Sequence, residues 1–273
     1  MALELTHLAY GPEGAETGPP LLIAHGLFGQ ARNFHTLARR LATGRRVIAV
    51  DMRNHGASPH DPEMTYPAMA DDLAGAIRRH CDGAAVVLGH SMGGKAAMTL
   101  ALTEPGLVRG LIVADIAPVA YTHSHLPYIR AMKALDLGKV RRRADADAAL
   151  AGAIPDPMLR GFLLQGLSLG GGEPRWRFNL DALESGMESL VGFPDTLAQA
   201  RYCGPTLVLR GGASDYVAPG DFDEIRARFP AAEIETIDGA GHWLHAEQPD
   251  AFLALTSAWL DLHGGQIHRS SVV

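Results

Sequence analysis

Short apolar runs recur along this chain and leave few folds open to it. They are rich in Val, Ile and Leu and cover residues 21–25, 47–51, 84–88, 111–115, 206–209 and 234–237. Runs of this length are typical of parallel strands that are buried on both faces of a sheet. Segments with helical periodicity, such as those behind Pro67 and Pro249, separate most of the runs. The alternation predicts an α/β fold with a doubly wound, mostly parallel sheet.

The alternation stops between Pro118 and Tyr202, where the chain has helical patterns, loops and three consecutive glycines but no clear strand. An insertion of this length is too long for a connecting loop. We expect a mostly helical cap, residues 118–202, over the carboxyl ends of the strands, where open α/β sheets bind ligands. A surface insertion without a functional part is the alternative. The expected division is a core of residues 1–117 and 203–263, the cap, and a C-terminal tail of residues 264–273.

Composition excludes several classes of function. The formal net charge is −6 and the 24 Lys and Arg residues form only short clusters, so nucleic acid is not an expected partner. No apolar run approaches the ~18 residues that a membrane helix needs. Cys81 and Cys203 lie far apart and the start does not resemble a signal peptide, which favours a cytoplasmic protein with reduced thiols. His123 and His125 lack a nearby third ligand, so we expect no metal. The sequence leaves the oligomeric state open.

The pattern Gly-x-Ser-x-Gly at residues 89–93 indicates a nucleophile. It follows an apolar run and opens an Ala-rich segment with helical character. A catalytic serine on a sharp turn between strand and helix needs small neighbours, because the backbone is strained and closely packed there. The amino end of the helix also favours negative charge. We therefore predict that Ser91 is the nucleophile.

A negatively charged tetrahedral intermediate needs two N–H donors aimed at its oxygen. The Met92 N–H, directly after the predicted nucleophile, is one candidate. The second is expected in the loop after the first apolar run, at residues 25–29. Leu27 is the preferred donor there, and Phe28 is the neighbouring candidate.

His242 is the predicted general base, because it lies in a glycine-rich loop just after the last apolar run. The acid that orients it is ambiguous. Asp115 ends one run, and Asp215 follows the next one. The usual acid position is three residues past a glycine, but two glycines precede it here. Counting from the second glycine selects Asp215, and counting from the first selects Ser214. The Ser214 hydroxyl can donate a hydrogen bond but cannot carry a charge.

Six segments together resemble one branch of the α/β-hydrolase superfamily, the YbfF-like esterases and their mitochondrial abhydrolase-domain relatives. These segments are residues 25–29, 51–59, 89–95, 114–118, 176–179 and 241–243. The resemblance implies the α/β-hydrolase fold and implies that Asp115 supports the histidine, with Ser214 beside it. The chain departs from this branch at Asp215, where relatives usually lack an acid, so both aspartates stay candidates.

These residues predict a serine hydrolase that cleaves small carboxylic esters or acyl thioesters through an acyl-enzyme, without a metal or organic cofactor. The resemblance implies short to medium acyl esters and acyl-CoA-type thioesters as substrates. Trp176, in the expected cap, is a candidate for the pocket lining, with ordinary packing as the alternative. A carbon–carbon bond hydrolase or a perhydrolase would use the same residues. A non-catalytic protein that keeps the fold as a ligand pocket is the alternative from a different class.

Overall fold

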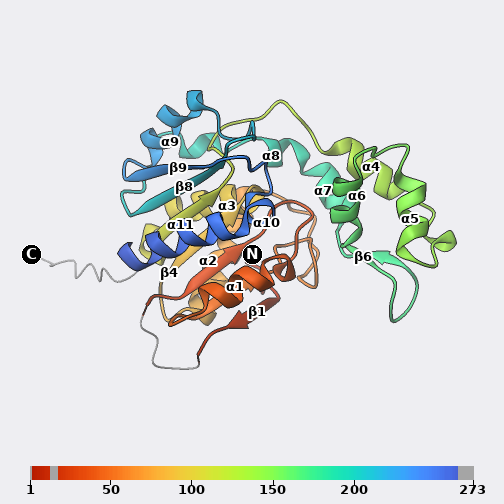
Figure 1. Cartoon of the computed structure of the whole chain (residues 1–273), viewed down its shortest axis with the longest axis horizontal. Helices are drawn as coiled ribbons and strands as arrows, with labels where there is room; N and C mark the ends of the chain where they lie inside the picture. The colour runs from red at the N-terminus through yellow and green to blue at the C-terminus, as the bar shows by residue number, and fades with distance from the viewer. Residues whose placement is uncertain (1, 13–17, 264–273) are drawn as a thin grey trace, which may run out of the picture.

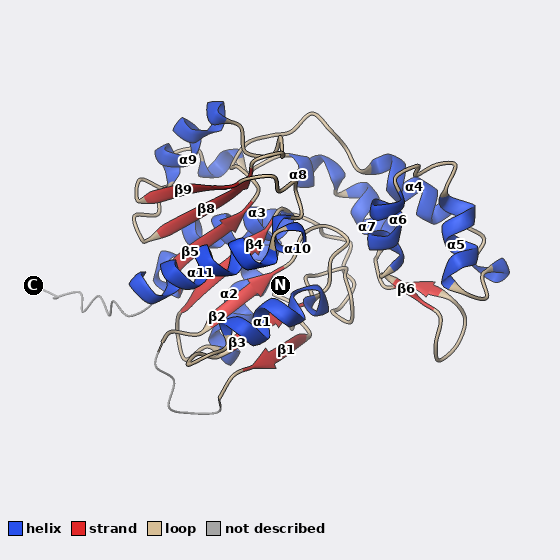
Figure 2. Cartoon of the chain, in the orientation of Figure 1, coloured by secondary structure: helices blue, strands red, loops and turns tan. Residues whose placement is uncertain are grey.

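A seven-stranded sheet runs through the larger part of the molecule (Figures 1 and 2). This computed structural model describes residues 2–12 and 18–263, so the predicted tail, residues 264–273, lies outside the described residues. The strand order is β1-β3-β2-β4-β5-β8-β9, in which β1 pairs antiparallel with β3 and the other neighbours pair parallel. The strands are β1 His7–Tyr10, β2 Leu21–Ala24, β3 Val47–Val50, β4 Ala85–His90, β5 Val108–Ala114, β8 Thr206–Gly211 and β9 Ala232–Ile237.

Six of these strands coincide with the six apolar runs of the sequence, and the predicted α/β fold with a mostly parallel sheet is confirmed. The boundaries differ by a few residues, most of all at β5, which begins at Val108 rather than at Leu111. No apolar run predicts β1. It lies at the edge of the sheet and its residues are half-buried or exposed, so its sequence has no need of a continuous apolar stretch.

Helices cover both faces of the sheet, and the side chains of each strand alternate between them. In β2, Leu22 packs into the hydrophobic cluster on the side of α2 and α3, while Leu21 and Ile23 pack into the cluster on the side of α1 and α11. Figure 1 shows α1 and α11 on the near side of the sheet. The helices of this layered part are α1 His35–Leu41, α2 Tyr66–His80, α3 Met92–Thr103, α9 Phe222–Arg228, α10 Leu244–Glu247 and α11 Pro249–His263.

Residues 118–202 form a group of short elements, most of which lie to one side of the sheet (Figure 1). A two-stranded antiparallel pair, β6 and β7, was not expected, because strands of two residues leave no pattern in a sequence. The division into core and cap stays a prediction. Within the described ranges, none of the helices combines the length and apolar character that crossing a membrane requires. The elements are α4 Leu126–Ala134, α5 Arg143–Leu150, α6 Pro157–Leu164, β6 Leu167–Ser168, β7 Arg175–Trp176, α7 Leu180–Ser185 and α8 Met187–Val191.

Candidate active site

Ser91 occupies a strained turn between the end of β4 and the start of α3. Its backbone has φ 52° and ψ −119°, a region that costs a non-glycine residue about 1–3 kcal/mol. Two glycines make the turn possible. A Cβ on Gly89 would lie 2.2 Å from the Gly93 carbonyl oxygen, and a Cβ on Gly93 would lie 2.4 Å from the Ala24 carbonyl oxygen. The sequence pattern therefore folds into the sharp strand-to-helix turn that holds a serine side chain at the end of the sheet.

Three predicted residues form a continuous chain of hydrogen bonds. The Ser91 hydroxyl lies 3.0 Å from His242 Nε2, and His242 Nδ1 lies 2.8 Å from Asp115 Oδ2. An ionised carboxylate accepts only, so the imidazole donates from Nδ1 and leaves Nε2 free to accept the serine proton. The residues come from the ends of β4 and β5 and from the loop after β9. The arrangement has the connectivity of a nucleophile, a base and an orienting acid.

Asp115 is fully buried at the end of β5, with a backbone φ of 53°. Its carboxylate accepts hydrogen bonds from the Gly211 N–H at 2.8 Å and from the Ser214 hydroxyl, besides the bond from His242. Three hydrogen bonds thus fix the orientation of this buried carboxylate. Asp215, by contrast, is exposed, and its carboxylate accepts no hydrogen bond from any described residue. The structure thus brings Asp115 and Ser214 to the histidine and leaves Asp215 outside.

The predicted oxyanion donors differ in whether their backbone N–H already donates a hydrogen bond. In the part of the chain that the structure describes, the N–H groups of Leu27 and Met92 have no acceptor, so both can bind an incoming oxygen. The Phe28 N–H instead donates to His55 Nε2 at 3.1 Å. Phe28 is therefore not placed as an oxyanion donor, although its side chain lines the adjacent cavity.

Two buried histidines hold the loop that carries Leu27. His25 donates from Nδ1 to the Gly26 carbonyl and accepts from the Met52 N–H at 2.9 Å, while His55 accepts from the Phe28 N–H. Burial lowers the pKa of His25 to about 4 and the pKa of His55 to about 3. Both rings are therefore neutral at pH 7, as acceptance at Nε2 requires. They fix the loop without adding a charge next to the oxyanion position.

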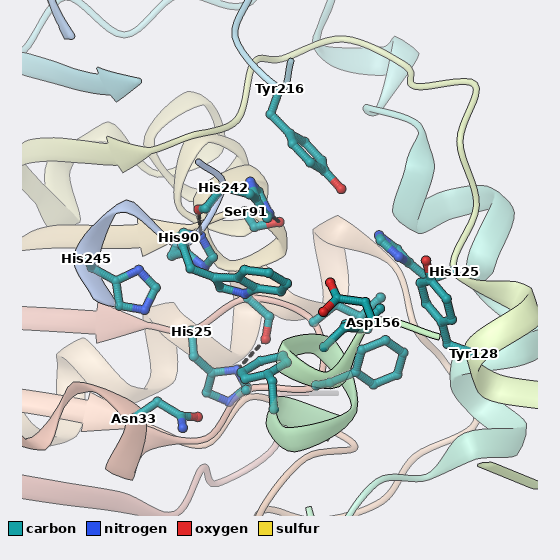
Figure 3. Close-up of a pocket in the computed structure, with 17 residues that line it drawn as sticks. His25, Asn33, His90, Ser91, His125, Tyr128, Asp156, Tyr216, His242 and His245 are labelled. Carbon is teal, nitrogen blue, oxygen red and sulfur yellow. Dashed lines mark hydrogen bonds between the residues drawn. The ribbon is translucent and has the colours of Figure 1, made fainter. Parts of the chain in front are cut away.

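A cavity of about 290 Å³ opens beside Ser91 (Figure 3). One wall is the loop at residues 25–29 together with His90, His242 and Trp243, and the other wall comes from α4 and α6 and the segments just before them. In Figure 3, His125, Tyr128 and Asp156 face the site from this second wall. The cavity therefore lies between the ends of the strands and the 118–202 insertion, where a substrate could reach the serine. The residues of the second wall are His125, Tyr128, Asp156, Leu159 and Phe162.

Trp176, a predicted lining residue, does not line this cavity. Its indole N–H donates to the Met132 carbonyl at 3.1 Å, and its ring stacks on Phe178. These contacts are those of packing within the insertion. Within the described residues, no group of three or more His, Cys, Asp or Glu side chains is arranged to hold a metal ion.

Two residues next to His242 were not singled out from the sequence. The Tyr216 ring stacks on the imidazole, with ring centroids 3.7 Å apart and planes 18° apart. Burial raises the pKa of Tyr216 to about 12, so the phenol stays neutral. His90 Nε2 donates to the His242 carbonyl at 2.9 Å and holds the loop that carries the imidazole. His90 lies inside the Gly-x-Ser-x-Gly pattern of residues 89–93, which could have drawn attention to it, whereas no pattern in the sequence marks Tyr216.

The comparisons with known proteins agree with this fold. Residues 21–255 match the model of the alpha/beta hydrolase family, so the chain belongs to this family. The sn-1-specific diacylglycerol lipase ABHD11 of Mus musculus is 43% identical over 256 residues, 91% of this chain and 83% of the relative. Esterase YbfF of Escherichia coli (strain K12) is 37% identical over 260 residues, 95% of this chain and 100% of the relative.

A solved structure, described as a marine microorganism esterase, superposes with a TM-score of 0.88 at 37% identity and covers 95% of this chain and 100% of its own. The α/β-hydrolase fold and the resemblance to the YbfF-like branch are therefore confirmed.

Proposed function

We propose that this protein is a serine hydrolase that cleaves small carboxylic esters through an acyl-enzyme on Ser91. Relatives named as an esterase and a lipase support the broader class, a hydrolase of carboxylesterase type. The observation that carries the proposal is the hydrogen-bond chain from Ser91 through His242 to Asp115. The hydroxyl, the imidazole and the carboxylate lie in the order that nucleophilic catalysis needs.

The reaction begins when His242 Nε2 takes the proton of the Ser91 hydroxyl as Oγ attacks the ester carbonyl. Asp115 stabilises the imidazolium that forms and keeps its proton on Nδ1. The Leu27 and Met92 N–H groups donate to the oxyanion of the tetrahedral intermediate. The bond to the leaving oxygen then breaks, and that oxygen takes the proton from Nε2. Water, activated by the same imidazole, hydrolyses the acyl-enzyme and restores Ser91.

Acyl thioesters, including acyl-CoA-type compounds, fit the same steps, because a thiolate leaves the tetrahedral intermediate more readily than an alkoxide does. The serine at position 91 disfavours the reactions of dehalogenases and epoxide hydrolases, which use an aspartate nucleophile. A carbon–carbon bond hydrolase or a perhydrolase would share the three residues, and a non-catalytic binding protein would keep them idle. A panel of esters, thioesters and ring-fission diketones distinguishes these classes by which substrates turn over.

The direct test is steady-state hydrolysis of 4-nitrophenyl acetate by paired aspartate variants. Asp115→Asn removes the charge that stabilises the imidazolium and should lower kcat by roughly 10³- to 10⁴-fold. Asp215→Asn is the matched control on the neighbouring strand end and should leave kcat unchanged, because Asp215 is exposed and makes no bond to His242. Loss of activity in the Asp215 variant alone would refute the assignment of the acid. A wild-type protein that hydrolyses no ester or thioester would refute the proposed function.

A further inference from the structure

Two cavities of very different size meet at Ser91. The larger one, about 290 Å³, is lined by His242 and Trp243 and reaches out to the second wall described above. The smaller one, about 30 Å³, lies beside Met92 and is lined by side chains that include Met187 and Leu190. His242 lines the larger cavity and not the smaller one. An ester bound at Ser91 therefore has two unequal spaces for its two halves.

The position of the general acid decides which half enters which space. In the proposed mechanism the leaving oxygen must take its proton from His242 Nε2, so it must depart on the side that His242 lines. The acyl carbon chain points away from the leaving oxygen at the same carbonyl carbon. The leaving group is thereby directed into the larger cavity and the acyl chain into the smaller one.

We propose that the small cavity is the acyl site and that Met187 and Leu190 limit its depth, which makes the enzyme selective for acetyl and similarly short acyl groups. This inference rests on the proposed function. The small cavity offers about 30 Å³ of free space, roughly a tenth of the 290 Å³ of the larger one. A short acyl group needs little of this space, whereas a long one would have to displace packed side chains such as Met187 and Leu190.

Hydrogen bonds made by residues of the lining hold part of the wall of the small cavity in place. Met187 is 3% exposed and Leu190 is 7% exposed. The Tyr66 hydroxyl donates to the Leu190 carbonyl at 2.7 Å and ties the end of α8 to α2. The Tyr121 hydroxyl donates to the Tyr216 carbonyl at 2.6 Å and ties two further parts of the lining together. On the side of α2 and α8 the small cavity is thus bounded by buried, hydrogen-bonded groups.

The larger cavity has different walls and accommodates a bulkier group. Leu159 and Phe162 of α6 supply apolar surface, and Phe162 lies near Trp243 with ring centroids 5.6 Å apart. An aromatic or branched alcohol can contact these rings. The same space would receive the thiol side of a thioester, so a short acyl group on a large leaving group is the favoured combination.

The first experiment needs no variant. kcat/KM is measured for 4-nitrophenyl acetate, butyrate and octanoate, which share one leaving group. The acyl-site assignment predicts a fall of about ten-fold or more from acetate to octanoate, since a mismatch of one methylene in a tight pocket already changes kcat/KM by ~10-fold or more. A second series keeps the acetyl group and enlarges the alcohol from ethyl to naphthyl, and here kcat/KM should not fall. Equal or faster hydrolysis of the octanoate would overturn the inference.

The second experiment enlarges each cavity in turn. Met187→Ala and Leu190→Ala should raise the octanoate-to-acetate ratio of kcat/KM by about ten-fold. The matched control is Phe162→Ala in the larger cavity, which should leave that ratio unchanged and alter the preference among acetate esters. A shift in acyl preference with the Phe162 variant instead would overturn the assignment. Hydrolysis of esters with the opposite chain-length order refutes the acyl site alone, whereas absence of all acyl transfer refutes the proposed function.

Discussion

Lys95 should hold the two ends of the 118–202 insertion together, and its replacement should destabilise the protein. It lies on α3, is 1% exposed, and donates from Nζ to the carbonyls of Val119 at 2.7 Å, Val191 at 3.0 Å and Gly192. The Tyr121 ring lies 4.6 Å from the ammonium. Among the described residues no carboxylate forms an ion pair with it, so the carbonyls and the ring are its main partners.

The protonation of Lys95 follows from two opposing effects. Burial lowers its pKa to about 7, but an ammonium can donate to all three carbonyls and a neutral amine to only two. The hydrogen bonds therefore favour the charged form that the geometry requires.

The expected cost of Lys95→Met follows from these bonds. Hydrogen bonds to a charged group contribute about 1.5–3 kcal/mol each. Val119, Val191 and Gly192 are all only half-buried, so water can bind their carbonyls and replace part of that loss. Removing the buried ammonium also removes the free-energy cost of its desolvation. We expect a net loss of about 3 kcal/mol in the free energy of unfolding. In a chain of this size it corresponds to a fall in Tm of roughly 6–12 °C.

The assay is urea and thermal unfolding followed by circular dichroism at one fixed pH. Lys139→Met is the matched control, because Lys139 is exposed and pairs only with Asp136. That substitution should change stability by less than about 0.5 kcal/mol. If Lys95→Met unfolds at the same urea concentration as the control, the three carbonyl bonds contribute no net stability and the reasoning is wrong.

Two further predictions concern the surroundings of the triad. Between pH 6.5 and about 4 the unfolded chain protonates its residue 25 imidazole while the buried His25 stays neutral, so His25 alone should lower the unfolding free energy by about 3 kcal/mol as the pH drops through this window. Urea titrations should show that His25→Gln flattens this fall, whereas His60→Gln, at an exposed position, does not. Ser214→Ala removes the hydroxyl that donates to Asp115 and should lower kcat about ten-fold with little change in KM, as steady-state kinetics will measure. An unchanged kcat would contradict this prediction, because it would show that the bonds from the Gly211 N–H and His242 hold the Asp115 carboxylate without Ser214.

The sequence predicts most of the sheet because parallel strands with helices on both faces must be apolar along their whole length. The residues of β2 and β3 are all buried, and their runs are unmistakable. β1 escapes prediction for the opposite reason, since an edge strand with exposed side chains has no such requirement. Within the insertion, the helices are short and their packing partners are distant in sequence, so periodicity alone does not reveal which of them face the cavity.

The sequence likewise reveals some residues of the candidate site and not others. Ser91 and His242 stand out because glycine-rich turns must carry them, and those turns are visible in the sequence. Asp115 and Asp215 both follow strand ends, and the choice between them depends on where each side chain points. The positive φ of Asp115 and its bond to the Gly211 N–H fix that direction, and neither can be read from residue types. The sequence also does not reveal that the Trp176 indole N–H donates to the Met132 carbonyl within the insertion, away from the cavity beside Ser91.

The central claim is that the residue 91 hydroxyl is the group that becomes acylated, with the imidazole of residue 242 as its base. A fluorophosphonate probe followed by peptide mass spectrometry tests it most directly. The account predicts one adduct, on Ser91, which disappears in Ser91→Ala and forms much more slowly in His242→Ala while both variants keep the wild-type circular dichroism spectrum. An adduct on another residue, or equal labelling of the Ser91 variant, would contradict the account.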